Sequence, residues 1–369
     1  MIISFLILGG FQSVISNKVF SFTGHYQVNQ FVLSQSLEDS PTSTNSEFYT
    51  NFRDRDYIEH VQVFANKPAL IKGEEEVEGV MMKGVGRDFD SLAFKPSIVK
   101  GRFIQFGDNG SSSNEIVVST KIARKMLLDV GSKVTMYFVQ DPPRFRRLEV
   151  VGLYETFLED FDDKFILGDI RVIQVLNDWD EDKVGGFEVF LKDPQTIDLY
   201  EDELYESIDY DLRLTKATDK FIQIFDWLEL LNNNVYVFLA LILFVASFNM
   251  VSILFILIME RTSMIGLLKA LGSTNLQIRN IFIWNGIRII GRGMFLGNLI
   301  GLGFGLLQQS THLFKLNAEN YYMSYVPIVW DWPIILGLNV LILVITTAVL
   351  FIPAVIISNV NPIKSIKFD

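Results

Sequence analysis

The sequence has no cysteine and only three histidines among its 369 residues. Without cysteine, the chain can form no disulfide framework, no thiolate metal site and no cysteine nucleophile. The histidines (His25, His60 and His312) lie far apart and form no H-x-x-x-H pair, which argues against a zinc enzyme. We therefore assign no metal ligand and no catalytic residue from these residue types.

Basic residues are also scarce, because 43 Asp and Glu outnumber 32 Lys and Arg, giving a formal net charge of −11. A nucleic-acid binder needs a basic surface to neutralise phosphates, so this balance argues against one. The chain has no G-x-x-x-x-G-K-[ST] motif, hence no P-loop for ATP, and no G-x-S-x-G nucleophile elbow. Two acidic runs, Glu159–Asp163 and Asp178–Asp182, lack the spacing of a calcium loop and are expected to be solvated loops.

The charged residues are concentrated in one part of the chain. Residues 26–233 hold 39 of the 43 acidic residues, whereas residues 1–25 contain a single charged residue, Lys18. The chain after residue 233 has eight basic and four acidic residues in an otherwise apolar sequence. This distribution predicts a water-facing domain inserted between membrane segments.

Three long apolar stretches are predicted to cross a membrane. Val235–Met259 and Ile334–Ser358 are uncharged runs of 25 residues each, and roughly 20 apolar residues suffice for a transmembrane helix. Ile281–Gln309 is also long enough, although it contains Arg288 and Arg292. These arginines lie four residues apart on one helix face. We expect them either to anchor the helix at the membrane boundary or to contact a partner or a lipid headgroup.

The loop charges predict the orientation in the membrane. The segment Glu260–Asn280 has three basic residues and one acidic residue, and the tail has Lys364 and Lys367, so both are predicted to be cytoplasmic. The acidic block then lies outside the cytoplasm, and one further crossing must precede it. Met1–Phe11 is apolar but only about half the length of a span. We therefore expect the sequence to begin within the outer part of its first transmembrane helix.

The water-facing block is predicted to be an α+β domain. Strand-like runs rich in β-branched and aromatic residues are Tyr57–Phe64, Glu115–Ser119, Lys133–Val139, Leu148–Tyr154 and Phe187–Lys192. Thr120–Asp129 has helical spacing, and Asp141–Arg144 is typical of a hairpin turn. Leu214–Asn234 is amphipathic and is expected to be a helix that continues into the second span, as a coupling element or as a passive connector.

The predicted organisation has eight parts. They are a first transmembrane helix (1–21, outer part only), an extracytoplasmic domain (22–233), a second helix (234–260), a cytoplasmic segment (261–280), a third helix (281–309), an outer loop (310–333), a fourth helix (334–358) and a cytoplasmic tail (359–369).

The third span contains a regular series of glycines at every fourth position: Gly293, Gly297, Gly301 and Gly305. Small residues on one helix face let backbones approach closely inside a membrane, where no hydrophobic effect drives helix association. We expect this face to pack within the bundle, or alternatively to form a dimer contact or a face that slides during gating.

Several stretches resemble permeases of the FtsX/MacB superfamily of ABC transporters. They are Ser247–Leu254, Met259–Arg261, and above all Ile265-Gly-Leu-Leu-Lys-Ala-Leu-Gly272, followed by Ile281-Phe282. Four further stretches resemble the lipoprotein-releasing LolC/LolE branch of that superfamily. They are Gly10–Gln12 with Phe22–His25, Val151–Thr156, Tyr325–Pro327 and Asn361–Lys364. The resemblance covers nearly the whole chain in order, and the KALG segment is shared across the superfamily.

The resemblance implies a four-helix permease of the bacterial inner membrane with its α+β domain in the periplasm. Such a chain is not an enzyme and holds no cofactor, because a separate ABC ATPase subunit binds ATP and Mg. The implied partners are that ATPase, a second permease copy or paralogue, lipoprotein cargo, a periplasmic carrier protein and membrane lipid, but no nucleic acid.

The resemblance also implies two contact sites. A coupling helix on the ATPase would comprise Met264, Ile265, Gly266, Lys269, Ala270, Leu271, Gly272 and Ser273. A carrier-binding hairpin at Tyr137–Leu148 would use Gln140, Pro142, Pro143, Arg144 and Arg146, unless this segment is an ordinary hairpin turn.

The sequence is also compatible with other functions. Within the superfamily, the chain is alternatively an FtsX-like regulator of cell-wall hydrolases or a MacB-like efflux permease. Outside it, the chain is alternatively a membrane sensor with an external ligand domain, although its cytoplasmic parts are too short for an output domain.

Overall fold

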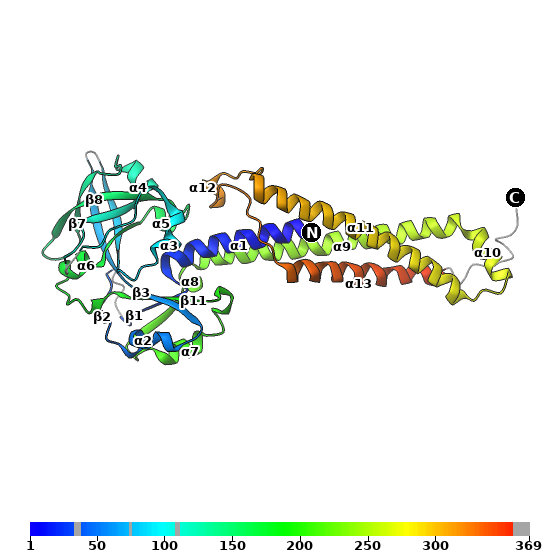
Figure 1. Cartoon of the computed structure of the whole chain (residues 1–369), viewed down its shortest axis with the longest axis horizontal. Coiled ribbons are helices and arrows are strands. Elements are labelled where there is room, and N and C mark those ends of the chain that lie inside the picture. The colour runs from blue at the N-terminus through cyan, green and yellow to red at the C-terminus, as the bar shows by residue number, and fades with distance from the viewer. Residues whose placement is uncertain (33–37, 74–75, 108–110, 357–369) are drawn as a thin grey trace. The chain divides into compact units, whose positions relative to one another are not determined.

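A computed structural model of the chain describes residues 1–32, 38–73, 76–107 and 111–356 (Figure 1). The chain forms two compact units. The sheet unit comprises Ile15–Phe225 and Asn317–Met323, and the helical unit comprises Met1–Val14, Asp226–Leu316 and the described residues from Ser324 onward. The predicted cytoplasmic tail, with Asn361–Lys364 and Lys367, lies outside the described residues.

The sheet unit is built on a ten-stranded sheet with the order β12-β1-β11-β3-β4-β9-β6-β8-β5, and β7 pairs with both β3 and β8. The strands are β1 (Tyr26–Gln30), β3 (Ile58–Lys72), β4 (Val77–Val85), β5 (Ile98–Gly101), β6 (Glu115–Ser119), β7 (Lys133–Phe138), β8 (Arg144–Tyr154), β9 (Phe165–Asp169), β11 (Gly186–Leu191) and β12 (Leu212–Lys216). A separate two-stranded sheet joins β2 (Thr42–Ser43) to β10 (Lys183–Val184).

Six of these strands form a closed barrel. The pairings run from β3 to β4, β9, β6, β8 and β7, and β7 returns to β3 through the register Leu70↔Tyr137. The long strand β3 belongs to two layers, because its first half pairs with β11 while its second half pairs with β4. Closure leaves none of these six strands with an unpaired edge, whereas the sheet as a whole still ends at β12 and β5.

The short helices of the sheet unit cover the sheet and its ends (Figure 1). They are α2 (Glu47–Thr50), α3 (Ser91–Phe94), α4 (Thr120–Lys125), α5 (Glu159–Asp162), α6 (Ile170–Leu176), α7 (Glu201–Ser207) and α8 (Ala217–Lys220), with 3-10 turns at Phe52–Asp54, Lys95–Ser97 and Pro194–Thr196. Their apolar side chains join those of the strands in one continuous core.

The five predicted strands are all present, and the predicted hairpin joins β7 to β8. Two helix predictions in this unit are partly wrong. Helix α4 ends at Lys125 rather than Asp129, because Leu127 adopts a left-handed backbone with φ of 53° that terminates the helix. Leu214–Lys216 belongs to β12 rather than to a helix, because these residues pair with β1 at the edge of the sheet.

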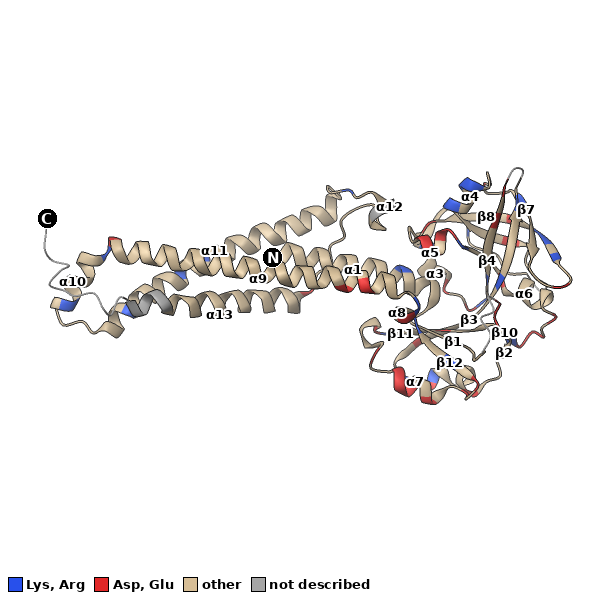
Figure 2. Ribbon diagram, turned by 180° about the vertical axis from the view of Figure 1, so that it is seen from behind, with Lys and Arg blue, Asp and Glu red and all other residues tan. Residues whose placement is uncertain are grey.

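Within the described residues, four helices are long and apolar enough to cross a membrane: α1 (Ile2–Thr23), α9 (Ile222–Glu260), α11 (Asn275–Thr311) and α13 (Trp332–Ile356). Figure 2 shows that charged residues gather in the sheet unit and are nearly absent along these helices. The helical unit also contains α10 (Thr262–Ala270), whereas the short helix α12 (Ala318–Tyr321) lies in the sheet unit.

Helices α9 and α11 are longer than the predicted spans. Helix α1 nearly coincides with the predicted first helix at residues 1–21, and Lys18 does not interrupt it. Helix α9 begins at Ile222 rather than at residue 234, and α11 begins at Asn275 rather than at residue 281. Hydropathy identifies the part of a helix that suits lipid, whereas helix ends depend on capping and on tertiary contacts. Where these helices enter and leave a membrane stays a prediction.

Candidate coupling and carrier-binding sites

The predicted coupling segment forms the short helix α10 and a tight turn into α11. Two hydrogen bonds close the turn: the Gly272 N–H donates to the Lys269 carbonyl at 3.1 Å, and the Ser273 N–H donates to the Leu268 carbonyl at 3.0 Å. This is a Schellman motif, and it places Gly272 at a φ of +93°, a conformation that glycine adopts without steric cost. The turn itself therefore requires Gly272.

The next helix begins with a capping box. The Thr274 hydroxyl accepts a hydrogen bond from the Gln277 N–H at 3.3 Å, and the Gln277 side chain accepts one from the Thr274 N–H at 2.9 Å. Each side chain satisfies a backbone amide that has no partner within the helix. The segment from Gly272 to Gln277 thus ends one helix and starts the next with a defined geometry.

The eight predicted coupling residues differ in how far they are exposed. Ile265 and Gly266 are buried at the end of the bundle, where Ile265 packs in a cluster with Ile258 of α9 and Ile278 of α11. Four others are exposed: Met264, Ala270, Leu271 and Gly272. The remaining two, Lys269 and Ser273, are half-buried.

The exposed face of α10 is an apolar ridge formed by Met264, Leu267 and Leu271. Leu267 is 58% exposed and Leu271 76% exposed. Their spacing of three and four residues places all three side chains on one face of the helix. The prediction omitted Leu267, although this spacing was the signal that could have identified it. We call these three residues the α10 ridge.

The four glycines of α11 have two different environments. A Cβ on Gly305 would lie 3.0 Å from Cη2 of Trp330 and 3.3 Å from Cδ1 of Leu6, so this glycine is closely packed. A Cβ on Gly301 would contact Ile2 and Ile3 of α1 at ordinary distances. A Cβ on Gly293 or Gly297 would have no atom within 4 Å, and both glycines line a cavity of about 510 Å³.

Two further glycines of the helical unit are closely packed, and the sequence analysis did not predict this packing. A Cβ on Gly10 would lie 2.5 Å from the Pro327 carbonyl oxygen, and one on Gly286 would lie 2.7 Å from Cδ1 of Leu350. The Val329 N–H also donates to the Leu6 carbonyl at 3.2 Å, beside the first of these contacts. The structure therefore packs the Gly10–Gln12 stretch against the Tyr325–Pro327 stretch, two segments that the sequence analysis singled out separately.

The β7–β8 hairpin carries the predicted carrier-binding residues, and its tip is anchored to the end of α6. Arg144 donates to both carboxylate oxygens of Asp178 at 2.7 and 3.0 Å and to the Leu176 carbonyl at 2.8 Å. The Gln140 amide donates to the same carbonyl at 3.4 Å. Both side chains thus hold the hairpin in place. Pro142, Pro143 and Arg146 are exposed.

Next to this tip, three exposed side chains lie side by side on the outer face of the barrel. The strand registers place Leu70 of β3 opposite Tyr137 of β7, and Tyr137 opposite Phe145 of β8. The Tyr137 and Phe145 rings have centroids 6.1 Å apart. We call Leu70, Tyr137 and Phe145 the barrel patch. The sequence analysis missed Leu70 because only the pairing of β3 with β7 brings it to this surface.

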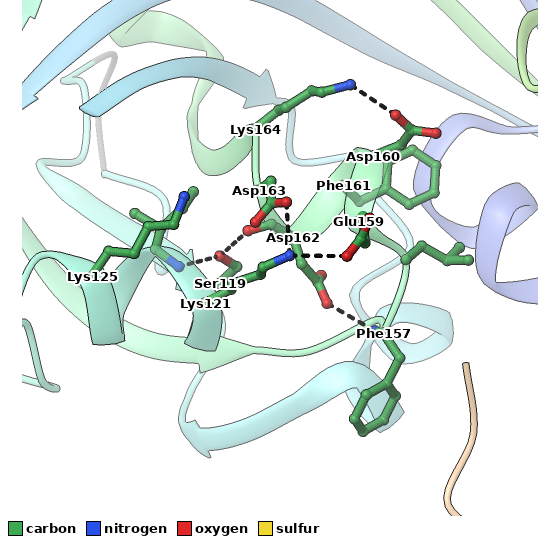
Figure 3. Close-up of polar contacts among 12 residues, drawn as sticks. Ser119, Lys121, Lys125, Phe157, Glu159, Asp160, Phe161, Asp162, Asp163 and Lys164 are labelled. Carbon is green, nitrogen blue, oxygen red and sulfur yellow. Dashed lines mark hydrogen bonds and ion pairs between the residues drawn. The ribbon is translucent and has the colours of Figure 1, made fainter. Parts of the chain in front are cut away.

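The first acidic run is not a solvated loop throughout (Figure 3). Asp162 is buried, and its carboxylate accepts hydrogen bonds from the Thr156 N–H, the Thr156 hydroxyl and the Phe157 N–H at 2.7–3.1 Å. Burial raises the pKa of Asp162, and these hydrogen bonds oppose that change. The carboxylate holds Phe157 in a left-handed conformation with φ of 62°.

The other acidic residues of this run behave as expected for surface groups. Glu159 and Asp163 accept hydrogen bonds from Lys121 at 3.4 and 2.7 Å, and Asp160 pairs with Lys164 at 2.8 Å (Figure 3). Exposed pairs of this kind contribute little to stability. Among the described residues, no group of three His, Asp or Glu side chains is placed to hold a metal ion.

Lys18, the single charged residue of the first 25, links three segments of the sheet unit. Its ammonium donates to the Thr156 carbonyl at 2.8 Å and to the Tyr322 carbonyl at 2.6 Å, and it lies 4.7 Å from the Phe157 ring centroid. These contacts connect α1 to the loop before α5 and to the segment that contains α12. A lone charge in an apolar helix was the sequence signal for such a role.

A buried polar network within the sheet unit links β1, β3, β4 and β11 to the end of α1 and to α8. Glu188 of β11 accepts hydrogen bonds from Lys83 at 2.7 and 2.9 Å, from Gln27 at 2.9 Å and from Gln62 at 2.8 Å. Lys83 also donates to the Phe22 carbonyl of α1, and Lys220 of α8 donates to Gln27 at 2.6 Å. Burial lowers the pKa of Lys83, while the neighbouring Glu188 carboxylate acts in the opposite direction.

Comparison with known proteins finds two family models that together match most of the chain. Residues 1–206 match the MacB-like periplasmic core domain, and residues 236–362 match the FtsX-like permease C-terminal family. The chain belongs to the FtsX-like permeases with a MacB-like periplasmic core. This permease is a multi-pass inner-membrane protein whose periplasmic α+β domain is inserted between its first two helices, as the sequence predicted.

Its relatives include lipoprotein-release permeases. The lipoprotein-releasing system transmembrane protein LolC of Neisseria meningitidis is 22% identical over 89% of this chain and 80% of the relative. LolE of Haemophilus influenzae is 20% identical over 98% of this chain and 89% of the relative. The periplasmic region of MacB from Actinobacillus actinomycetemcomitans is 12% identical, with a TM-score of 0.39, over 55% of this chain and 92% of that structure.

Proposed function

We propose that this permease extracts lipoproteins from the outer leaflet of the inner membrane and passes them to a periplasmic carrier protein. It is the non-catalytic membrane subunit, and a separate ATPase subunit binds ATP and Mg and supplies the energy. A second permease copy or a paralogue completes the membrane part. The relatives named LolC and LolE support this proposal, because each aligns with most of this chain.

The single observation that carries the coupling part of the proposal is the α10 ridge. Three apolar side chains project from a helix whose following turn has a defined geometry, in the segment that the charge pattern predicts to be cytoplasmic. Such a surface in water is typical of a protein interface. The ATPase would cover the ridge, and the buried Ile265 would pass its movement to α9 and α11 through their shared cluster.

The carrier side of the proposal rests on the barrel patch and the exposed hairpin tip. Arg144 and Gln140 hold the tip in position, while Pro142, Pro143 and Arg146 are available for contact. An apolar patch together with a hairpin that carries an exposed arginine fits a partner that presents both apolar and acidic groups. The carrier would bind this surface when cargo leaves the membrane.

The membrane part of the proposal rests on the uncharged helices. One face of α9 presents the exposed side chains Phe244 and Phe248, which give acyl chains an apolar surface without ionised groups. The chains would lie between two permeases, lined by α1 and α9. Closure of the ATPase would move α9 and α11, and α9 continues into the sheet unit at Ile222, so the movement would reach the periplasm.

Cell fractionation tests the cargo. After depletion of this permease, lipoproteins labelled with a radioactive acyl chain should accumulate in the inner membrane instead of the outer membrane. Normal delivery of lipoproteins together with a defect in septation or in drug resistance would contradict lipoprotein release. It would instead favour a regulator of cell-wall hydrolases or an efflux permease.

Charge insertion tests the coupling surface. Leu267→Asp should abolish transport and co-purification of the ATPase, because it places a carboxylate in an apolar contact. Leu276→Asp is the matched control, since Leu276 is also 58% exposed but lies on α11 outside the ridge. Equal loss with both variants, or normal ATPase binding by Leu267→Asp, would show that the α10 ridge is not the contact.

A further inference from the structure

One face of α11 carries two cations that have no partner among the described residues. Arg288 and Arg292 are exposed, and neither takes part in an ion pair or side-chain hydrogen bond among the described residues. Trp284 precedes them by one turn on the same face and is 66% exposed. Gly286 and Ile290 on the other side of the helix are packed in the bundle, so the arginines face away from it.

The position along α11 places these cations at a membrane boundary. Gly293–Thr311 is an uncharged helical segment of about 29 Å at 1.5 Å per residue, which matches a hydrocarbon core of about 30 Å. Aromatic side chains mark its far end, where the Trp330 indole donates to Gln309 at 2.7 Å. Arg292 therefore lies near the opposite boundary, which the loop charges assign to the cytoplasmic side.

The same helix face becomes apolar toward the membrane interior. Phe295 and Leu299 follow the arginines on this face, and both are exposed. The face thus presents an indole, then two guanidinium groups, then an apolar stripe. This order matches a phospholipid, whose phosphate lies at the boundary and whose acyl chains extend into the core.

We propose that Trp284, Arg288 and Arg292 bind an anionic phospholipid of the cytoplasmic leaflet. The guanidinium groups would pair with the phosphate, for which their planar donors are well suited, and the indole would lie among the headgroups. The acyl chains would pack along Phe295 and Leu299. A net negative lipid is favoured over a zwitterionic one because the described part of the chain supplies no counter-charge to the two cations. This site would bind structural lipid and is separate from the proposed cargo path.

Fluorescence quenching by brominated lipid tests the site in the full-length protein. The permease is reconstituted in phosphatidylcholine vesicles that contain increasing fractions of phosphatidylglycerol with brominated acyl chains, and brominated phosphatidylcholine serves as the reference. We expect quenching by the anionic lipid to exceed that by the reference. The excess should disappear in Trp284→Phe, which assigns it to this tryptophan among the five in the chain.

Arginine variants test the charge dependence. Arg288→Gln and Arg292→Gln should each weaken the apparent affinity for phosphatidylglycerol by about fivefold. The double variant Arg288→Lys with Arg292→Lys should retain selectivity for phosphatidylglycerol, because it keeps both positive charges. It also controls for a folding defect caused by replacing the arginines. The matched control is Arg261→Gln, which removes an exposed charge from the turn before α10.

Three results would overturn the proposal. Equal quenching by the two brominated lipids would mean that the arginines reach any headgroup without selection. Selectivity that survives the double glutamine variant would place the lipid elsewhere. Efficient cross-linking of an Arg288→Cys variant to a second copy, readily scored because the chain has no other cysteine, would identify this face as a protein interface.

Discussion

The sheet unit and the helical unit differ in which side chains they bury and which they expose. In the sheet unit, Lys83, Glu188 and Gln62 are almost completely buried and bond to one another or to the backbone. In the helical unit, large apolar side chains such as Phe244 and Leu299 are exposed, and Arg288 and Arg292 of α11 are exposed as well. The solvent explains the difference, since water surrounds one unit and lipid tails surround the other.

The two units are therefore held together by different interactions. The sheet unit can bury an ion pair because hydrogen bonds from neighbouring strands satisfy the remaining groups of Glu188. The helical unit has few such groups and relies on close backbone approach, as at Gly10 beside Pro327. The same kind of substitution should therefore have different costs in the two units.

Breaking the buried ion pair should have the largest effect. Glu188→Leu would leave the Lys83 ammonium buried without its carboxylate, at a cost of about 3–5 kcal/mol in unfolding free energy. The double variant Lys83→Met with Glu188→Leu should recover most of that loss, because both charges are removed together. Urea unfolding of the purified protein, followed by near-UV circular dichroism, measures both. A single variant as stable as the wild type would mean that water reaches this network.

The second prediction concerns pH and His25. The Leu191 N–H donates to Nδ1 of His25 at 3.0 Å, and burial lowers the pKa of His25 to about 4. The folded state thus binds this proton more weakly than the unfolded chain does. The stability from neutral His25 is complete above about pH 6.5 and is lost as the pH falls toward 4, by about 3 kcal/mol in total.

Comparison with His25→Gln isolates this contribution from the other titrating groups. The wild-type protein should lose about 3 kcal/mol more than the variant between pH 6.5 and 4. Unfolding curves of both proteins at several pH values give this difference. Parallel pH dependence of the two proteins would show that folding does not change the pKa of His25.

Close packing at Gly10 gives the third prediction. Gly10→Val should cost about 1–3 kcal/mol, because its Cβ would overlap the Pro327 carbonyl, which belongs to the backbone and cannot rotate away. Gly9→Ala is the adjacent control, since a Cβ there meets nothing within 4 Å and alanine favours a helix. Thermal unfolding in detergent compares them, and equal midpoints would argue against this contact.

The smallest effects are expected within the glycine series of α11. Gly293→Ala should stabilise the helical unit by up to about 1 kcal/mol through helix propensity, because its surroundings are open. Gly305→Ala should gain nothing or lose slightly, because Trp330 and Leu6 would have to shift. Thermal unfolding of both variants in the same detergent tests this ranking. The reverse ranking would indicate that another chain covers Gly293.

In the sheet unit, the sequence predicted secondary structure correctly where it depends on residues that are neighbours in the chain. Glu115–Ser119 was predicted with the bounds that β6 has, because its β-branched run is uninterrupted. Leu214–Lys216 was assigned to a helix because amphipathic spacing over a short segment does not reveal that β1 lies beside it. The predicted coupling set was incomplete for a similar reason. Exposure of Leu267 and burial of Ile265 depend on how α10 lies against α9 and α11.

The sequence by itself determined the division into apolar helices and a charged domain, because hydropathy and charge reflect the solvent around each segment. It also determined the α10–α11 turn, because a Schellman glycine and a capping box act within a few residues. Only the tertiary structure decided which side chains share a site. Strand pairing brought Leu70 beside Tyr137, and helix packing brought Gly10 against Pro327. Such contacts join residues far apart in the chain, and no local pattern encodes the distance between them.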